Sequence, residues 1–239
     1  MLGQKIVNLA RQLIDRPVVS RVLEGVDLHS DNRLRERGIL AQAFEFKKIN
    51  EVPGDYFEFG LWRGKTFTYA HRLARRYHCN GMKLWGFDSF SGLPQIDDAR
   101  DSVWSAGQFA CSEPEFRQIL RRAGVAETDY ELVPGYYEQS LNDALHARLA
   151  GSHAAIAYID CDLYVSTLQA LDFLKRYLVN GSIVCFDDFY CYKGNPDQGE
   201  QKALQEFLVN NSDIIFMPWF DYAPLGKAFI VRIPGSGAS

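Results

Sequence analysis

Short apolar runs alternate with helical segments from residue 56 to residue 209, and this alternation constrains the fold more than any other feature. Strands that alternate with helices form a parallel sheet covered on both faces, so the pattern predicts an α/β fold with a doubly wound, mostly parallel sheet. The last two strands follow one another without a helix, which predicts one antiparallel strand closing the sheet. Strands are expected at residues 56–59, 83–87, 130–133, 155–159, 182–186, 213–217 and 227–232, and helices at 65–77, 113–123, 141–149, 166–178 and 199–209.

Residues 1–52 are predicted to form a helical extension ahead of a main domain at 53–234, with a flexible tail at 235–239. Apolar residues recur at helical spacing before Pro17, and a second helix is expected from about Asp31 to about Ile49, before Pro53 and Gly54. With few basic residues, the first helix is expected to dock on protein in preference to a membrane surface. We expect these helices to act as a lid or as a homo-oligomer contact.

Composition excludes several classes of protein. A net charge of −4, from 26 Lys and Arg against 30 Asp and Glu, provides no attraction toward nucleic acid or an anionic membrane. No apolar run reaches the ~18–20 residues that span a bilayer, and no signal peptide is recognisable. The five cysteines include no CxxC pair and are interpreted as reduced thiols. We therefore expect a cytoplasmic protein without nucleic-acid partners and without stable membrane insertion.

A glycine-containing turn follows the first strand, from Gly60 to Gly64, and ends in Lys65 and Thr66. Glycines let the backbone approach a ligand, and the helix that follows presents free amides. The turn is similar to a P-loop at its end, but a P-loop has four residues between its glycines and this turn has three. The spacing therefore disfavours a P-loop nucleotide-binding protein.

The second strand ends in Asp88, at the place where an acid suits the hydroxyl groups of a ribose. The alternative interpretation of Asp88 is a simple helix cap. These features alone do not separate NAD from S-adenosylmethionine (SAM). The missing third glycine of GxGxxG, and the lack of stacked amides for a pyrophosphate, favour a nucleoside cofactor without phosphates.

Carboxylates follow two later strands: Asp160 and Asp162 after one, Asp187 and Asp188 after the next. If these strands are neighbours, their tips lie ~5 Å apart and three carboxylates face one cleft. Carboxylates this close together either have a raised pKa or bind a cation. A set of oxygen ligands without His or Cys suits Mg²⁺ or a similar ion. The alternative is that these acids cap helices, and Asp162, just before the predicted helix, is the one most expected to be structural.

Taken together, these residues make the chain similar to class I SAM-dependent methyltransferases and, more narrowly, to the macrocin O-methyltransferase family. The segments that carry the resemblance are residues 52–55 (VPGD), 58–64 (EFGLWRG), 85–94 (WGFDSFSGLP), 134–137 (PGYY), 159–167 (IDCDLYVST) and 187–189 (DDF). The resemblance implies a seven-stranded, Rossmann-like sheet and magnesium-dependent methylation of a sugar hydroxyl on a small-molecule or glycan acceptor.

The resemblance also implies roles for individual residues. SAM would be held by Glu58, Gly60, Leu61, Trp62, Arg63, Gly64, Asp88, Ser89, Phe90, Ser91 and Gly135. The metal would be bound by Asp160, Asp187 and Asp188, and Asp160 is also the candidate for taking the proton of the acceptor hydroxyl.

The chain differs from the family pattern at two places. Lys65 stands where a glycine is more usual, and the segment from Gly194 to Lys202 differs from its usual version. The second departure leaves the acceptor open. Trp219, Phe220 and Tyr222 are expected in a loop near the cleft, as a sugar-stacking wall or as an ordinary hairpin tip. The remaining alternatives are an O-methyltransferase for phenolic or catechol acceptors and a non-catalytic SAM- or nucleotide-binding module.

Overall fold

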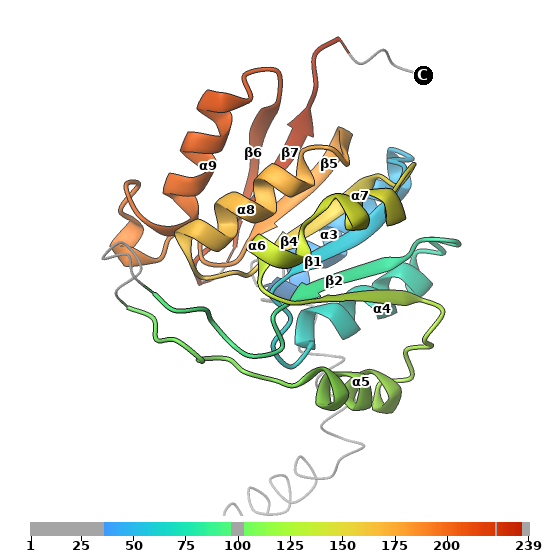
Figure 1. Ribbon diagram of the computed structural model, residues 1–239. Coiled ribbons are helices and arrows are strands. Elements are labelled where there is room, and N and C mark those ends of the chain that lie inside the picture. The colour runs from blue at the N-terminus through green and yellow to red at the C-terminus, as the bar shows by residue number, and fades with distance from the viewer. Residues whose placement is uncertain (1–35, 97–102, 223, 236–239) are drawn as a thin grey trace, which may run out of the picture.

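Seven strands in the order β3-β2-β1-β4-β5-β7-β6 form the centre of the computed structural model, which describes residues 36–96, 103–222 and 224–235 (Figure 1). Strand β7 pairs antiparallel with both of its neighbours, and the other pairs are parallel. The predicted α/β sheet with one antiparallel strand is therefore confirmed. The strands are β1 (Asp55–Phe59), β2 (Leu84–Asp88), β3 (Tyr130–Pro134), β4 (Ala154–Ile159), β5 (Leu178–Phe186), β6 (Ile215–Tyr222) and β7 (Gly226–Arg232).

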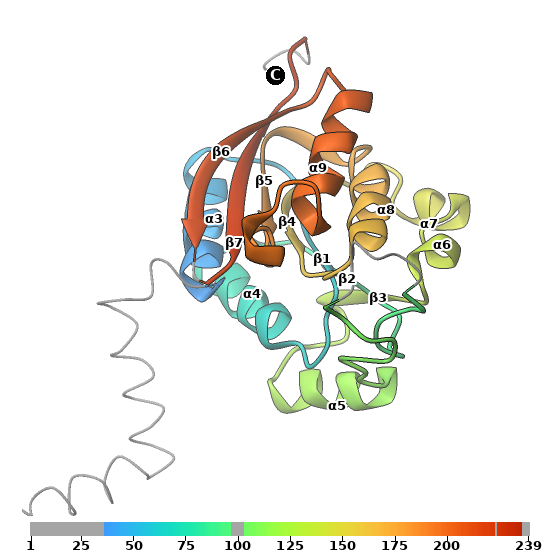
Figure 2. The same ribbon diagram turned by 90° about the vertical axis from the view of Figure 1, so that its left-hand side faces the viewer.

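Helices cover the two faces of the sheet as separate layers (Figure 2). Successive side chains of β1 point to opposite faces, as strand geometry requires. Tyr56 lies against Phe44 and Phe67 on one face, and Phe59 lies against Phe173 on the other. One layer holds α3 (Glu36–Ile49), α4 (Lys65–Arg76) and α5 (Glu113–Arg122). The other holds α6 (Tyr137–Ser140), α7 (Asp143–Arg148), α8 (Tyr164–Leu174) and α9 (Gly199–Asn210), with the short helix η4 (Tyr192–Gly194) preceding α9.

Helix α3 belongs to the main core. Its side chains Ile39, Leu40, Ala43 and Phe44 are fully buried in the cluster that covers one face of the sheet. Residues 36–49, which were assigned to the predicted extension, are thus part of the main fold. The predicted helix before Pro17 lies outside the described residues, as does the expected start at Asp31.

Strand β5 begins at Leu178, where the sequence pattern predicts the end of a helix. The pattern is misleading because the register of β5 against β4 shifts after the pair Ala154 and Leu178. The Ser182 hydroxyl bridges this irregularity: it accepts from Val179 N at 2.8 Å and donates to Ala154 O at 2.7 Å. Leu171, Leu174 and Leu178 stand at helical spacing, so the apolar pattern continues past the end of the helix.

The expected aromatic loop is wrong, because Trp219, Phe220 and Tyr222 lie within β6. The ring of Trp219 meets Phe46 of α3 edge-on, with centroids 5.4 Å apart. The Tyr222 hydroxyl donates to Phe186 O at 2.6 Å. These side chains therefore hold the sheet edge against its neighbours and do not line the cavity described below.

None of the helices in the described part of the chain has the length and apolarity that a membrane span requires.

Candidate active site at the carboxyl ends of the strands

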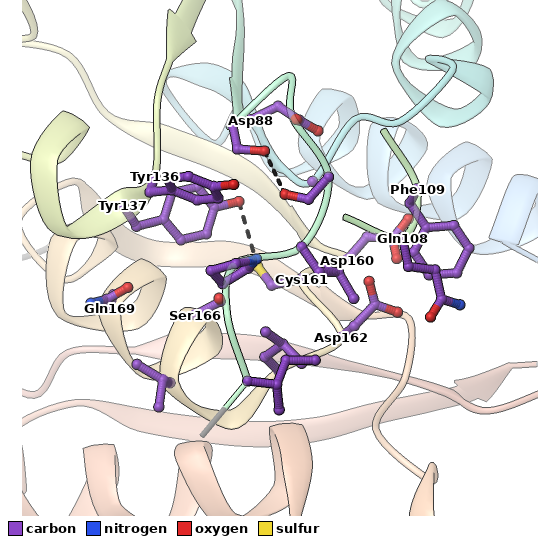
Figure 3. A pocket seen from close by; sticks show the side chains of 18 of the residues that line it. Asp88, Gln108, Phe109, Tyr136, Tyr137, Asp160, Cys161, Asp162, Ser166 and Gln169 are labelled. Atoms are coloured by element: carbon purple, nitrogen blue, oxygen red, sulfur yellow. Dashed lines mark hydrogen bonds between the residues drawn. The ribbon is translucent and has the colours of Figure 1, made fainter. Parts of the chain in front are cut away.

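A cavity of about 650 Å³ opens beyond the carboxyl ends of β1, β2, β3 and β4 (Figure 3). The strand order reverses between β1 and β4, and ligands of doubly wound sheets bind at such a point. The volume falls within the ~300–1,000 Å³ that is usual for small-molecule sites. Each strand contributes the residues that directly follow it, so the loops after the four strands build the site together.

Gly60 sits where the ends of β1 and β4 approach most closely. Its φ is +86°, and a Cβ there would lie 1.8 Å from the backbone oxygen of Asp160. The strand ends are joined by the bond from Asp160 N to Phe59 O, at 2.8 Å. Only glycine permits this approach, so the glycine of the predicted turn places the first loop of the cavity beside Asp160.

Asp88 binds the backbone amides of two loops and is also a candidate ligand group. Its Oδ2 accepts from the amides of Leu61 at 2.7 Å and Trp62 at 3.2 Å, and its Oδ1 accepts from the amide of Phe90 at 2.6 Å. Burial raises the pKa of Asp88, and these three amides oppose that shift. A carboxylate has about four acceptor positions, so one remains for a ligand without breaking the turn. Asp88 therefore holds the two loops together and is not the helix cap of the alternative interpretation, and it keeps one acceptor position for a ligand.

Glu58 is fully buried and does not line the cavity. Its Oε1 accepts from the Thr66 hydroxyl at 2.5 Å, and its Oε2 accepts from the Tyr56 hydroxyl. Burial raises the pKa of Glu58 to about 8, against the lowering effect of both hydroxyls. Glu58 thus ties β1 to the first turn of α4 from behind the site.

The cavity takes in some predicted cofactor residues and leaves out others. It is lined by Gly60, Leu61, Trp62, Asp88, Ser89 and Gly135, but not by Glu58, Arg63, Gly64, Phe90 or Ser91. Sequence reasoning did not single out Tyr136, Phe109 or Gln169, which also line it. Tyr136 lies in the PGYY segment, so a signal existed; Phe109 and Gln169 come from distant segments that no spacing connects to the strand ends.

Three carboxylates converge at the ends of β4 and β5. One oxygen each from Asp160, Asp162 and Asp188 lie within 4.8 Å of one another. Asp162 is buried and has a φ of +61°, in the left-handed region that is uncommon for residues other than glycine but that Asp adopts more readily than most. Asp160 and Asp162 also line the cavity, where they lie apart from Asp88 (Figure 3).

The third member of the group differs from the predicted set. Asp187 lies outside it, and the Tyr158 hydroxyl donates to Asp187 Oδ1. Asp162, which the sequence suggested to be structural, takes its place. Asp187 is nevertheless close to Asp160, because its charge contributes more than any other to the raised pKa of Asp160, after burial.

The donor set fits a hard divalent cation. It consists of carboxylate oxygens alone, with no His or Cys in the group, and Mg²⁺ prefers such ligands. The charges of Asp187, Asp162 and Asp188 add to burial in raising the pKa of Asp160 well above its usual value. A cation among them would offset this repulsion.

The family model for macrocin-O-methyltransferase (TylF) matches residues 15–211. A curated relative, the 8-demethyl-8-(2,3-dimethoxy-alpha-L-rhamnosyl)-tetracenomycin-C 4'-O-methyltransferase of Streptomyces olivaceus, is 30% identical over 145 residues, which cover 58% of this chain and 54% of the relative. The chain spans about half the length of the curated relatives it matches.

Solved structures show the same fold. The O-methyltransferase NovP has a TM-score of 0.69 at 24% identity, covering 81% of this chain and 78% of NovP. The calicheamicin methyltransferase CalS11 has a TM-score of 0.67 at 23% identity, covering 95% and 91%. The seven-stranded, mostly parallel sheet is thus the class I methyltransferase fold.

The raised pKa of Glu58 predicts a pH dependence of stability. Between about 4.5 and about 8 the folded protein holds a proton that the unfolded chain releases, so the free energy of unfolding falls as pH rises through this window. The slope from one such group reaches about 1.4 kcal/mol per pH unit. The Gln side chain in Glu58→Gln does not titrate. In this variant we therefore expect the free energy of unfolding, measured with urea, to fall less steeply with pH by this amount.

Glu127→Gln is the matched control, because the Glu127 side chain is 69% exposed. Both variants are compared with the wild type across the window, with EDTA present throughout. Equal slopes in the wild type and Glu58→Gln would show that Glu58 is ionised in the folded protein at neutral pH.

Proposed function

Because the chain belongs to the macrocin-O-methyltransferase family, we propose that it transfers the methyl group of SAM to a sugar hydroxyl, with a divalent cation such as Mg²⁺ in the acidic group. The observation that carries this proposal is one continuous site. Asp160 and Asp162 belong to the three-carboxylate group and also line the cavity at the strand ends. The acceptor class is supported by the named substrate of the Streptomyces olivaceus relative, which contains a rhamnosyl group.

The charge of the cavity favours SAM over phosphate-bearing cofactors. Among the described residues that line it, none is Lys, Arg or His, whereas Asp88, Glu138, Asp160 and Asp162 are acidic. Nucleotide phosphates call for basic side chains or stacked amides, and a sulfonium cation suits acidic surroundings. This acidic lining argues against a nucleotide-binding module.

The loops after β1, β2 and β3 form the proposed SAM subsite. Gly60, Leu61 and Trp62 line the cavity, and Asp88 accepts one ribose hydroxyl with its remaining acceptor position. Gly135 and Tyr136 close the side formed by the loop after β3. Glu58 acts indirectly, by holding the turn that carries the backbone amides.

SAM supplies an electrophilic methyl group, and a bound divalent cation lowers the pKa of a hydroxyl that it contacts. Asp160 accepts the proton of the acceptor hydroxyl as the oxygen–methyl bond forms and the sulfur–methyl bond breaks. The cavity walls align oxygen, methyl and sulfur, and such alignment supplies several kcal/mol of the barrier lowering.

Methyl transfer to sugars is tested with the purified chain, SAM and a panel of rhamnosides, with catechols as the competing acceptor class. We expect S-adenosylhomocysteine to form when a rhamnoside is the acceptor. Its formation should stop when EDTA is added and resume with excess Mg²⁺. Transfer to catechols alone would replace the sugar acceptor with a phenolic one. Transfer that is insensitive to EDTA would eliminate the metal.

The Asp88 assignment predicts weaker SAM binding in Asp88→Ala. Losing one charge-assisted hydrogen bond costs roughly 1.5–3 kcal/mol, which raises the Kd roughly ten- to a hundredfold in calorimetry. Asp143→Ala, at an exposed position in the first turn of α7, should leave the Kd unchanged. An Asp88→Ala variant with wild-type affinity would contradict the ribose contact.

The carboxylate geometry predicts an order of metal affinities. We expect Asp160→Asn and Asp188→Asn to lose Mn²⁺ binding in calorimetry while SAM binding persists. Since Asp162 lies within the group and Asp187 outside it, Asp162→Asn should weaken Mn²⁺ binding more than Asp187→Asn. The exposed Asp172, changed to Asn, is the control.

Two results would change this assignment. A larger loss in Asp187→Asn than in Asp162→Asn would give the third ligand position to Asp187, as the sequence resemblance implies. Undiminished Mn²⁺ binding in both Asp160→Asn and Asp188→Asn would remove the metal site from this group.

A further inference from the structure

Glu200, in the first turn of α9, is a buried acid that the proposed reaction does not use. Only 1% of its surface is exposed. Its Oε2 accepts from the backbone amide of Asp188 at 3.0 Å. Its Oε1 is buried and, within the part of the chain that the structure describes, has no hydrogen-bond partner. A buried acceptor of this kind is costly to leave unpaired, so Oε1 calls for a partner that the described residues do not provide.

The surroundings of Glu200 indicate what that partner is. Its Oε2 binds the backbone amide of Asp188, and Asp188 is one of the three acids of the metal group, so the Glu200 carboxylate lies beside that group. Glu200 is not a member of the three-carboxylate group itself. It therefore contacts Asp188 from outside the group.

Glu200 lies outside the segments that carry the family resemblance. The acids after β4 and β5, in contrast, belong to the segments that carry the resemblance. The Glu200 side chain therefore adds an acidic group beside the proposed metal ligands and does not replace one of them.

We infer that Glu200 is an outer carboxylate of the metal site: Oε2 fixes Asp188 through its backbone amide, and Oε1 accepts a hydrogen bond from a water molecule in the hydration shell of the cation. Mg²⁺ usually keeps several of its waters when bound to protein, and outer hydrogen-bond partners typically alter metal affinity 10- to 100-fold. Glu200 is therefore a positioning residue. The inference rests on the proposed function, since it requires a cation at Asp160, Asp162 and Asp188.

Glu200→Gln separates the two roles. The amide oxygen of Gln can still accept from Asp188 N, whereas its NH₂ group in place of Oε1 donates and so repels a metal-bound water. We expect Glu200→Gln to weaken Mn²⁺ binding about 10-fold or more by calorimetry, with unchanged SAM affinity and an unchanged Tm in EDTA. Glu206→Gln, which removes one charge from the same helix near Lys202, should retain the wild-type Mn²⁺ affinity.

The outcomes distinguish this inference from the proposed function. Wild-type Mn²⁺ affinity in Glu200→Gln, beside a loss in Asp188→Asn, would overturn the role of Glu200 and leave the metal site in place. Absence of Mn²⁺ binding in the wild type would overturn both. If Glu200→Gln does not fold, Glu200→Asp is the second variant, because it keeps the charge but shortens the side chain by one methylene group. We expect Glu200→Asp to bind Mn²⁺ at least about 3-fold more weakly than the wild type. Unchanged Mn²⁺ affinity in this variant would also contradict the inference.

Discussion

The parallel pairing of β4 with β5 is the constraint on which the site depends. Ile159 is paired with Phe186, and the amide of Asp187 donates to Ile159 O at 3.0 Å. Because both strands run in the same direction, the acids that follow them emerge at one end of the sheet and repel one another. The buried β-strands and the helices on both faces hold them there, so the folded chain maintains a concentration of negative charge that a divalent cation can neutralise.

The same strand ends connect the acids to the cavity at the ends of β1 to β4. The loop after β1 can approach the loop after β4 because Gly60 has no Cβ that would clash with the backbone oxygen of Asp160. The rings of Phe59 and Phe87 stack with their centroids 4.4 Å apart and hold β1 beside β2. Asp88 then fixes the first loop through its amides. Asp160 belongs to both the cavity and the acidic group, and it is there that the proposed reaction brings methyl donor and acceptor hydroxyl together.

The sheet could be predicted from the sequence because the period of the apolar pattern identifies its strands. The positions of Asp88, Asp160 and Asp188 could also be predicted, because ligands of such sheets bind at the carboxyl ends of the strands. The sequence was not sufficient to choose between Asp162 and Asp187. That choice depends on the left-handed backbone at Asp162 and on the Tyr158 hydroxyl that engages Asp187, and neither has a sequence signal. The strand expected at 213–217 stops directly before Pro218, whereas β6 continues through Pro218 to Tyr222, because an edge strand tolerates a proline.

The central claim is that one divalent cation lies between the ends of β4 and β5, next to the SAM cavity. The most direct measurement is anomalous X-ray scattering from crystals of the protein grown with Mn²⁺ and S-adenosylhomocysteine. The account predicts one strong anomalous peak coordinated by carboxylate oxygens of Asp160 and Asp188, with S-adenosylhomocysteine in the adjoining cavity. Well-ordered carboxylates without a peak between them, or a peak at a different set of residues, would contradict it.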